Sequence, residues 1–164
     1  MRLTTTIKGG QNVREALRKL RANLDGPRHV LVGVPKGAGA YKDGTQTAVI
    51  AAVNHFGSAD GRIPARPFLD VAVIENELKY VKIAEQLLPQ VAAGEIPINK
   101  ALDKIGLTAA ADVQQKIVDV RTPPNAHSTI ARKGSSNPLI KDGHLRLSIS
   151  HVLANAGEQV EEGL

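Results

Sequence analysis

The chain has 164 residues, with 21 lysines and arginines against 16 acidic residues, and it contains no cysteine and no tryptophan. This length allows one domain with a hydrophobic core of its own, and an apolar content of 42% argues against disorder throughout. The absence of cysteine excludes disulfides, thiolate metal sites and cysteine nucleophiles, and it suits a cytoplasmic protein. Two tyrosines and two phenylalanines are too few for a platform that stacks single-stranded bases.

The start of the chain, MRLTTTIKGG, has no apolar run of the length found in signal peptides, and no segment is long and apolar enough to span a membrane. We therefore expect no membrane association. Basic residues outnumber acidic ones by seven to two in residues 1–28 and by five to one in residues 121–146. Such regions attract polyanions, although a solvated basic surface is the more common explanation.

The first part of the chain predicts a helix followed by a strand. Within residues 12–24, apolar residues recur at spacings of three and four, as they do along one face of an amphipathic helix. Asn12 followed by Glu15 is typical of a capping box at the helix start, and Gly26-Pro27 indicates its end. Valines alternate with other residues in 28–34, which predicts a largely buried strand.

Two irregular segments flank a short predicted helix. Residues 35–45 are small and glycine-rich, which predicts a mobile loop, and residues 58–67 are restricted by two prolines. Between them, residues 47–56 predict a helix that ends at Gly57. Its inward face is expected to consist of four apolar residues, namely Val49, Ala52, Val53 and Phe56.

Two long helices follow. Apolar residues at helical spacing run from Val71 to Val91, and Pro89 should kink or end this helix. A second periodic segment covers residues 98–120, in which Gly106 allows a break. Because only a few residues join them, the two helices are expected to lie antiparallel and to cover each other's apolar faces.

The last part of the chain predicts a long connection and a strand. Residues 122–143 are rich in proline, glycine, serine and threonine, so little regular structure is expected there. Residues 144–150 alternate between apolar and polar, which predicts a half-buried strand, and the tail from Ala154 should fray.

The predicted fold class is α+β: a small, mainly antiparallel sheet packed against two long central helices, with an N-terminal helix alongside. We expect one domain over residues 1–164, with an ordered core of about 12–152 and with mobile loops at 35–45 and 122–143.

Motifs for catalysis are absent. The segment from Gly37 to Lys42 follows a predicted strand, but it lacks the glycine spacing and the Gly-Lys-Ser/Thr ending of a phosphate-binding loop. The five histidines form no HExxH pair, and no GxSxG is present. We therefore predict no catalytic, cofactor-binding or metal site and no enzymatic activity. Nucleic-acid binding stays open as an alternative, through Arg14, Arg18 and Arg21 on the N-terminal helix and through the Arg132-Lys133 loop.

Four segments, taken in order, point to a family: Ala52-Val53-Asn54-His55-Phe56-Gly57, residues 63–69 (IPARPFL), residues 129–134 (TIARKG), and residues 138–145 (PLIKDGHL) leading to Ser148-Ile149. Together they resemble the tail-completion and virion-morphogenesis proteins of tailed bacteriophages and prophages, over roughly residues 30–152. Those proteins typically carry an acid where this chain has His55, and Asp-Thr where it has Lys141-Asp142.

The resemblance implies a structural virion component at the head-to-tail junction (neck), without enzymatic activity. It implies a homo-oligomeric ring, such as a hexamer, with other phage tail and connector proteins as partners. The protein would occur in the virion and, during assembly, in the host bacterial cytoplasm. Basic residues facing the channel of such a ring would contact DNA without sequence specificity.

The candidate interface combines mobile loops with a stiff proline corner, because a segment that is already rigid loses little entropy on docking. A rigid internal connector explains the proline corner equally well, and Arg66 could pair with a carboxylate of a neighbouring subunit or of its own chain. The apolar segment at Pro138 is expected to be buried in its own domain rather than in a partner. The candidate residues are Gly37, Gly39, Tyr41, Lys42, Pro64, Arg66, Pro67, Phe68, Arg132, Lys133, Pro138 and Leu139.

Overall fold

The computed structural model describes residues 10–158. The expectations for the first nine residues and for the end of the tail lie outside this range. In chain order, the elements are α1 (Gly10–Asn23), β1 (His29–Gly33), α2 (Thr47–Phe56), α3 (Phe68–Glu75), α4 (Glu77–Ala93), α5 (Ile98–Asp119), α6 (His127–Lys133), α7 (His144–Leu147) and β2 (Ser150–Ala154).

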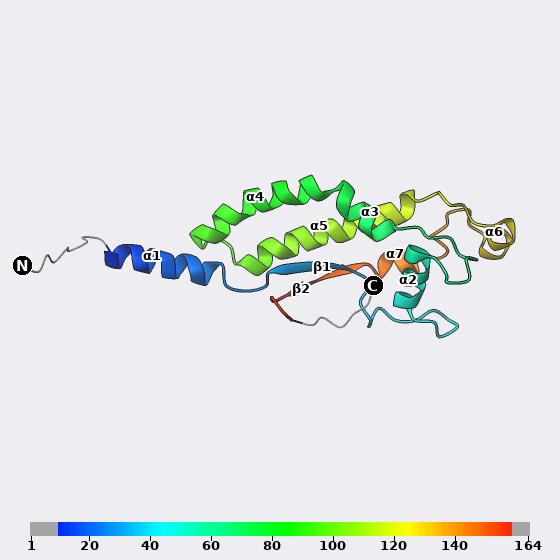
Figure 1. Ribbon diagram of the computed structural model, residues 1–164, viewed down its shortest axis with the longest axis horizontal. Helices are drawn as coiled ribbons and strands as arrows, with labels where there is room; N and C mark the ends of the chain where they lie inside the picture. Colours follow the sequence, from blue (N-terminus) through cyan, green and yellow to red (C-terminus); the bar gives the residue numbers. More distant parts are fainter. Residues whose placement is uncertain (1–9, 159–164) are drawn as a thin grey trace, which may run out of the picture.

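The molecule is elongated, and its layers follow its long axis (Figure 1). Strands β1 and β2 form an antiparallel pair, in register from His29 opposite Ala154 to Gly33 opposite Ser150. Helix α5 covers one face of this two-stranded sheet, and α4 packs against α5 on the side away from the strands. The structure thus confirms an α+β fold with an antiparallel sheet against two long helices.

The core is aliphatic apart from one aromatic ring. It gathers where α3, α5 and α7 meet the end of β1, and its fully buried members include Phe68, Val113, Ile117 and Val34. The segment that follows α6 adds Leu139, which confirms that this apolar stretch is buried in its own domain. Burying a side chain of this size stabilises a fold by about 1.5–3 kcal/mol.

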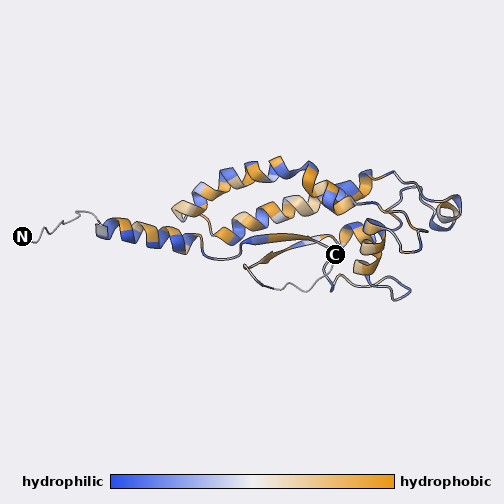
Figure 2. Cartoon of the chain, viewed as in Figure 1, coloured by the Kyte–Doolittle hydropathy of each residue, from blue (hydrophilic) through white to orange (hydrophobic). Residues whose placement is uncertain are grey.

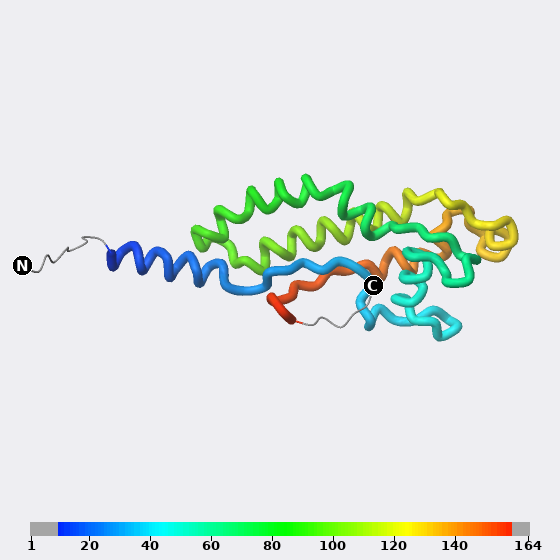
Figure 3. The backbone as a smooth tube through the Cα atoms, viewed as in Figure 1, coloured from blue at the N-terminus to red at the C-terminus, as the bar shows by residue number. Residues whose placement is uncertain are grey.

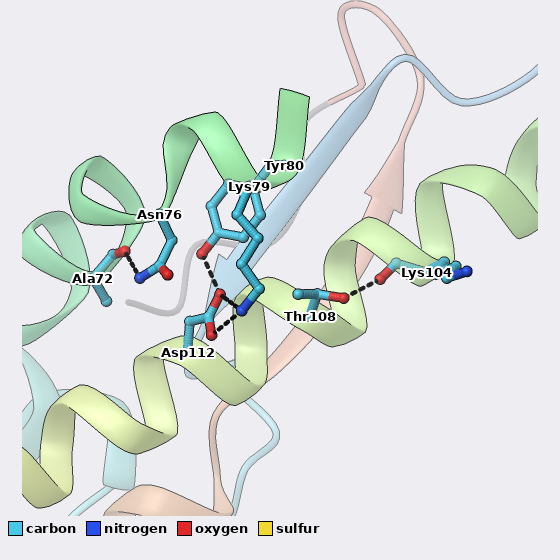
Figure 4. A network of polar contacts seen from close by, with 7 residues as sticks. All are labelled: Ala72, Asn76, Lys79, Tyr80, Lys104, Thr108 and Asp112. Carbon is cyan, nitrogen blue, oxygen red and sulfur yellow. Dashed lines mark hydrogen bonds and ion pairs between the residues drawn. The ribbon is translucent and has the colours of Figure 1, made fainter. Parts of the chain in front are cut away.

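The long helices differ in detail from the expectation. The periodic segment from Phe68 is two helices, because the backbone leaves helical geometry at Asn76, whose side-chain amide donates to the Ala72 carbonyl (2.9 Å; Figure 4). Pro89 does not end α4, which continues to Ala93, and Gly106 causes no break in α5. Gly106 instead permits close packing, because a Cβ there would lie 2.2 Å from the ring of His151 on β2.

Helix α2 has the predicted bounds but presents the opposite face to the core. Its buried residues are Thr47, Ala51 and His55, whereas Val49 and Phe56 are exposed, the latter at 67%. Thr47 Oγ1 donates to the Gly39 carbonyl, and His55 Nε2 lies 3.2 Å from Asp70 Oδ2. The second ring nitrogen of His55, Nδ1, is buried without a hydrogen-bond partner among the described residues. Apolar periodicity cannot anticipate a face that is buried through hydrogen bonds.

The predicted strand at 144–150 is wrong. Residues 144–147 form the helical turn α7, and the strand β2 starts only at Ser150. At the start of α7, the backbone amide of His144 donates a hydrogen bond to Asp142 Oδ1. Leu145 and Ile149 are buried and lie four residues apart, whereas Leu147 between them is 71% exposed. Strand β1 is also less buried than expected, because one face of the sheet is left without a covering helix in the described chain.

Helix α1 does not lie alongside the domain. It projects beyond the sheet and the helix pair, and none of its residues is buried (Figures 1 and 3). It begins at Gly10, before the predicted capping box at Asn12. Its periodicity is helical, as expected, but its apolar face contacts no other element along most of its length.

A polar cluster joins α4 to α5 and makes stability depend on pH. The Tyr80 hydroxyl donates to Asp112 Oδ2 (3.0 Å), and Lys79 Nζ contacts the same carboxylate at 2.6 Å (Figure 4). Burial, and then the hydrogen bond and charge of Asp112, raise the pKa of Tyr80 well above its ordinary value. The folded state therefore favours the neutral phenol, whose stabilising contribution is complete below pH 10 and is lost as the pH rises above it.

We expect the unfolding free energy of the protein to fall between pH 10 and pH 11 and to fall less in the Tyr80→Phe variant. Urea denaturation at each pH measures this, and absorbance at 295 nm follows phenolate formation. Burial also raises the pKa of Tyr41, so the variant separates the two tyrosines. Equal pH slopes for the two proteins would contradict the assignment.

Candidate docking cleft

A cleft of about 290 Å³ lies at the end of the molecule opposite α1, between α2, the proline segment, α6 and the segment before α7. All four segments that carry the family resemblance contribute to its walls. They are far apart in the chain, yet they meet here through residues that include Asn54, Pro64, Arg66, Thr129, Lys133, Leu139, Gly143 and His144.

Arg66 holds two walls of the cleft together. It is 3% exposed, and its Nε donates to the Pro123 carbonyl at 2.8 Å while its Nη2 lies 3.3 Å from the Pro124 carbonyl. Longer contacts of 3.5 Å reach the Pro64 carbonyl and Asn125 Oδ1. Every one of these acceptors is uncharged and belongs to the same chain, so Arg66 fixes the loop after α5 rather than pairing with a carboxylate.

Lys133 plays the same part at the end of α6. Its Nζ donates to the carbonyls of Asn137 and Pro138, both at 2.8 Å, which closes the turn between α6 and the next segment. Burial lowers the pKa of Lys133, and the positive charges of Arg66 and Lys141 lower it further. Asn137 continues the framework, because its side chain accepts from the Leu139 amide and donates to the Val118 carbonyl.

His144 connects α7 to the loop before α2. Its Nε2 lies 2.9 Å from Thr47 Oγ1, and its ring packs edge-on against Tyr41 with centroids 4.7 Å apart. Because the Thr47 hydroxyl donates to the Gly39 carbonyl, the imidazole must be the donor in the first contact. This contact joins α7 to the start of α2 and braces this side of the cleft.

The cleft is strongly basic. Its lining includes five cationic side chains and one carboxylate, that of Asp142. Arg66 and Lys133 are engaged with carbonyls, and Arg62 pairs with Asp60 at the surface. Arg132 and Lys141 are exposed at the cleft. A surface of this kind suits a partner segment that carries carboxylates or phosphates. Within residues 10–158, no group of three or more histidine or acidic side chains is placed to hold a metal ion.

The candidate interface residues divide by exposure. Arg66, Phe68, Pro138 and Leu139 are buried in the protomer, so they shape the surface but do not form it. Tyr41 and Lys133 are half-buried. Those that are exposed are Gly37, Gly39, Lys42, Pro64, Pro67 and Arg132.

The loop at 35–45 is folded onto itself and onto α2. Gly39 adopts a φ of 86°, and its carbonyl accepts from both the amide and the hydroxyl of Thr47. Ala40 pairs with Gln46 in an isolated bridge. The sequence does not mark Thr47, Asn125 or Asn137 as site residues, because a polar residue that braces a loop leaves no pattern in the sequence.

Comparisons with protein-family models, curated proteins and solved structures gave no match for this chain. Over residues 10–158, no helix combines the length and the apolar character that crossing a bilayer requires.

Proposed function

We propose that this protein is a structural subunit of a tailed-phage virion, which forms a homo-oligomeric ring at the head-to-tail junction during tail completion. The observation that carries the proposal is the convergence of the four resembling segments on one cleft. Segments that are brought together by the fold act as one surface, so the resemblance concerns a site and not scattered residues.

The chemistry of the cleft supports docking rather than catalysis. Arg66 and Lys133 donate hydrogen bonds to backbone carbonyls, which makes the walls rigid. The exposed cationic side chains border the opening. A rigid surface binds a partner without a large ordering cost. At the opposite end of the molecule, α1 exposes an apolar face, and exposed apolar surfaces of this kind are typical of protein–protein contacts. Binding surfaces at two ends are what a subunit needs to meet its neighbours in a closed ring.

Nucleic-acid binding is the second candidate, favoured by the excess of positive charge around the cleft. A DNA-binding cleft would show an affinity for duplex DNA that falls steeply with salt concentration, and Arg132→Glu would weaken it. If a titration shows no salt-dependent affinity, the cationic residues serve protein contacts alone.

The test of the proposed function is a phage or prophage that lacks this gene. We expect negative-stain micrographs to show separate heads and tails, and the wild-type gene supplied in trans to restore joined particles. The double variant Arg132→Glu, Lys141→Glu should fail to restore them, although its circular dichroism and melting temperature match those of the wild type. The control Lys100→Glu changes an exposed lysine on α5 outside the cleft and should restore particles fully. Infectious virions formed without the gene would refute the proposal.

A further inference from the structure

Helix α1 presents an apolar stripe that nothing covers among the described residues. Val13 and Leu17 are each 59% exposed, and Leu20 and Leu24 continue the stripe over three turns. Figure 2 shows these hydrophobic residues along a helix that stands clear of the rest of the domain. An isolated helix of 14 residues is only marginally stable in water, so its stability depends on a surface that buries this face.

The base of α1 is firmly attached, which gives the helix a set direction. Asn23 Nδ2 donates to the Ala92 carbonyl at 3.1 Å, next to Gly94, where α4 ends with a φ of 78°. Gly26 packs so closely that a Cβ there would lie 2.8 Å from the side chain of Ile98. Helix α1, which we call the arm, therefore leaves the domain at the turn between α4 and α5 and extends away from its own protomer (Figure 3).

A matching surface lies on the outward side of α3 and α4. Ile74 and Leu78 are exposed at 71% and 75%, and Val81 and Leu88 extend this second stripe along α4. From Leu78 to Leu88 the stripe covers ten residues, about 15 Å of helix, and from Val13 to Leu24 the stripe of α1 covers eleven, about 16 Å. The apolar stripe of α1 and the part of the second stripe that lies on α4 are therefore similar in length, and Glu85 interrupts the second stripe between Val81 and Leu88.

The charges beside the two stripes are opposite. Helix α1 carries four basic residues and one acid, a net charge of +3, with Arg14 and Arg21 two turns apart beside the stripe. Residues 68–93 carry four acids and two lysines, a net charge of −2. Of these acids, Glu85 lies within the outward stripe, between Val81 and Leu88, and Glu77 lies beside the stripe, as does the exposed Lys82. Neither glutamate has an ion-pair partner within residues 10–158.

We infer that α1 of one copy lies along the outward face of α4 in the next copy, with Val13, Leu17 and Leu20 on Leu78, Val81 and Leu88 and with the arginines near Glu77 and Glu85. The inference rests on the proposed self-association and names the surfaces that carry it. The contact is heterologous, because each copy offers an arm at one end and accepts another arm on its side, so successive contacts build a ring.

Other occupants of the α1 stripe fit less well. Pairing of α1 with a second α1 would bring two helices of charge +3 together. Folding back onto α4 of the same chain would require breaking the contacts of Asn23 and Gly26. An anionic membrane would attract the arginines, but the stripe holds no aromatic residue of the kind that anchors interfacial helices.

The absence of cysteine makes a sharp experiment available. Separately purified Leu17→Cys and Val81→Cys proteins are mixed and treated with a short bis-maleimide crosslinker. We expect a covalent dimer that contains both variants, identified by mass spectrometry of the linked peptides. Glu15→Cys lies on the opposite side of α1 and, mixed with Val81→Cys, should give at most a tenth of that product.

Each other product overturns the inference. Leu17→Cys dimers alone would show α1 pairing with α1. A chain that carries both Leu17→Cys and Val81→Cys provides a further product. An internal link in this chain, without heterodimers from the mixture of single variants, would show that α1 folds back onto its own α4. Co-flotation with phosphatidylserine vesicles that Leu17→Glu abolishes would show membrane binding. Absence of any link overturns it as well. If the protein still forms rings by mass photometry, the proposed function survives this failure, whereas a protein that never self-associates, even with phage tails, contradicts both.

Further substitutions test the apolar contact and the charges separately. Because Leu17 is 59% exposed among the described residues, Leu17→Glu should leave the melting temperature unchanged and weaken self-association at least about tenfold, as expected when one leucine fails to be buried. Reversing Glu85 to Arg should also weaken self-association, and Arg14→Glu with Arg21→Glu in the same chain should restore part of it. Self-association that is unchanged in both the Leu17→Glu and the Glu85→Arg proteins would overturn the inference.

Discussion

Replacing Arg66 with alanine is expected to lower the free energy of unfolding by about 3 kcal/mol, the largest effect of any single polar residue in the cleft. Arg66 is almost fully buried, and its removal leaves the carbonyls of Pro123 and Pro124 without their protein donors and frees the loop after α5 from the proline segment. Arg66→Lys should recover only part of the loss, because one ammonium cannot reach both carbonyls and Asn125 together. Urea denaturation followed by circular dichroism measures all three proteins.

Arg62 provides a matched control. It lies four residues before Arg66 in the same segment, but its side chain is 86% exposed and pairs only with Asp60 at the surface. Arg62→Ala should therefore change stability by less than about 0.5 kcal/mol. Equal losses for the two substitutions would show that Arg66 contributes through general charge and not through its buried hydrogen bonds.

The substitution Gly106→Ala is expected to destabilise the protein by about 2 kcal/mol, although alanine favours a helix by about 1 kcal/mol over glycine. The new methyl group would lie 2.2 Å from His151 Cδ2 and 2.6 Å from His151 Cγ, so the His151 ring must be displaced, either by itself or together with β2. Movement of His151 would also break its 2.8 Å contact with Asp103, which joins β2 to α5.

Ala111→Gly in the same helix separates the two effects. Ala111 is exposed, so this change should cost only the helix propensity of about 1 kcal/mol. In the double variant Gly106→Ala, His151→Ala, the methyl group has room, and the propensity gain should reappear. A Gly106→Ala protein that is more stable than the wild type would contradict the close packing of β2 on α5.

The sequence predicts the helices well because their signal is local. Apolar residues recur at helical spacing in α1, α2 and α5, and these helices form with nearly the expected bounds. The break at Asn76 was missed, since the apolar spacing continues across it and the interruption depends on a side chain that binds the Ala72 carbonyl. Three alternating apolar residues predicted a strand at 144–150, but burial of Leu145 and Ile149 on one side of a helical turn satisfies the core equally well.

The cleft was harder to predict because its lining residues lie up to 104 residues apart in the chain, from Tyr41 to Leu145. Arg66 and Lys133 were chosen as interface residues, and the structure places both at the cleft, although their contacts are with backbone carbonyls of their own chain. Every residue has a backbone carbonyl, so nothing in the sequence marks the ones that accept hydrogen bonds from Arg66 and Lys133. The brace between Thr47 and His144 was missed for a related reason, since both residue types are common at surfaces.

The attachment of α1 by one end gives it the mechanics of a lever. Fourteen residues of helix reach about 21 Å from the base, so tilting the helix by about 10° at Asn23 displaces its tip by about 4 Å while the domain stays fixed. A change of a few degrees at this joint is therefore amplified at the far end of α1. In the proposed ring, such a change would let α1 follow differences in spacing between neighbouring copies.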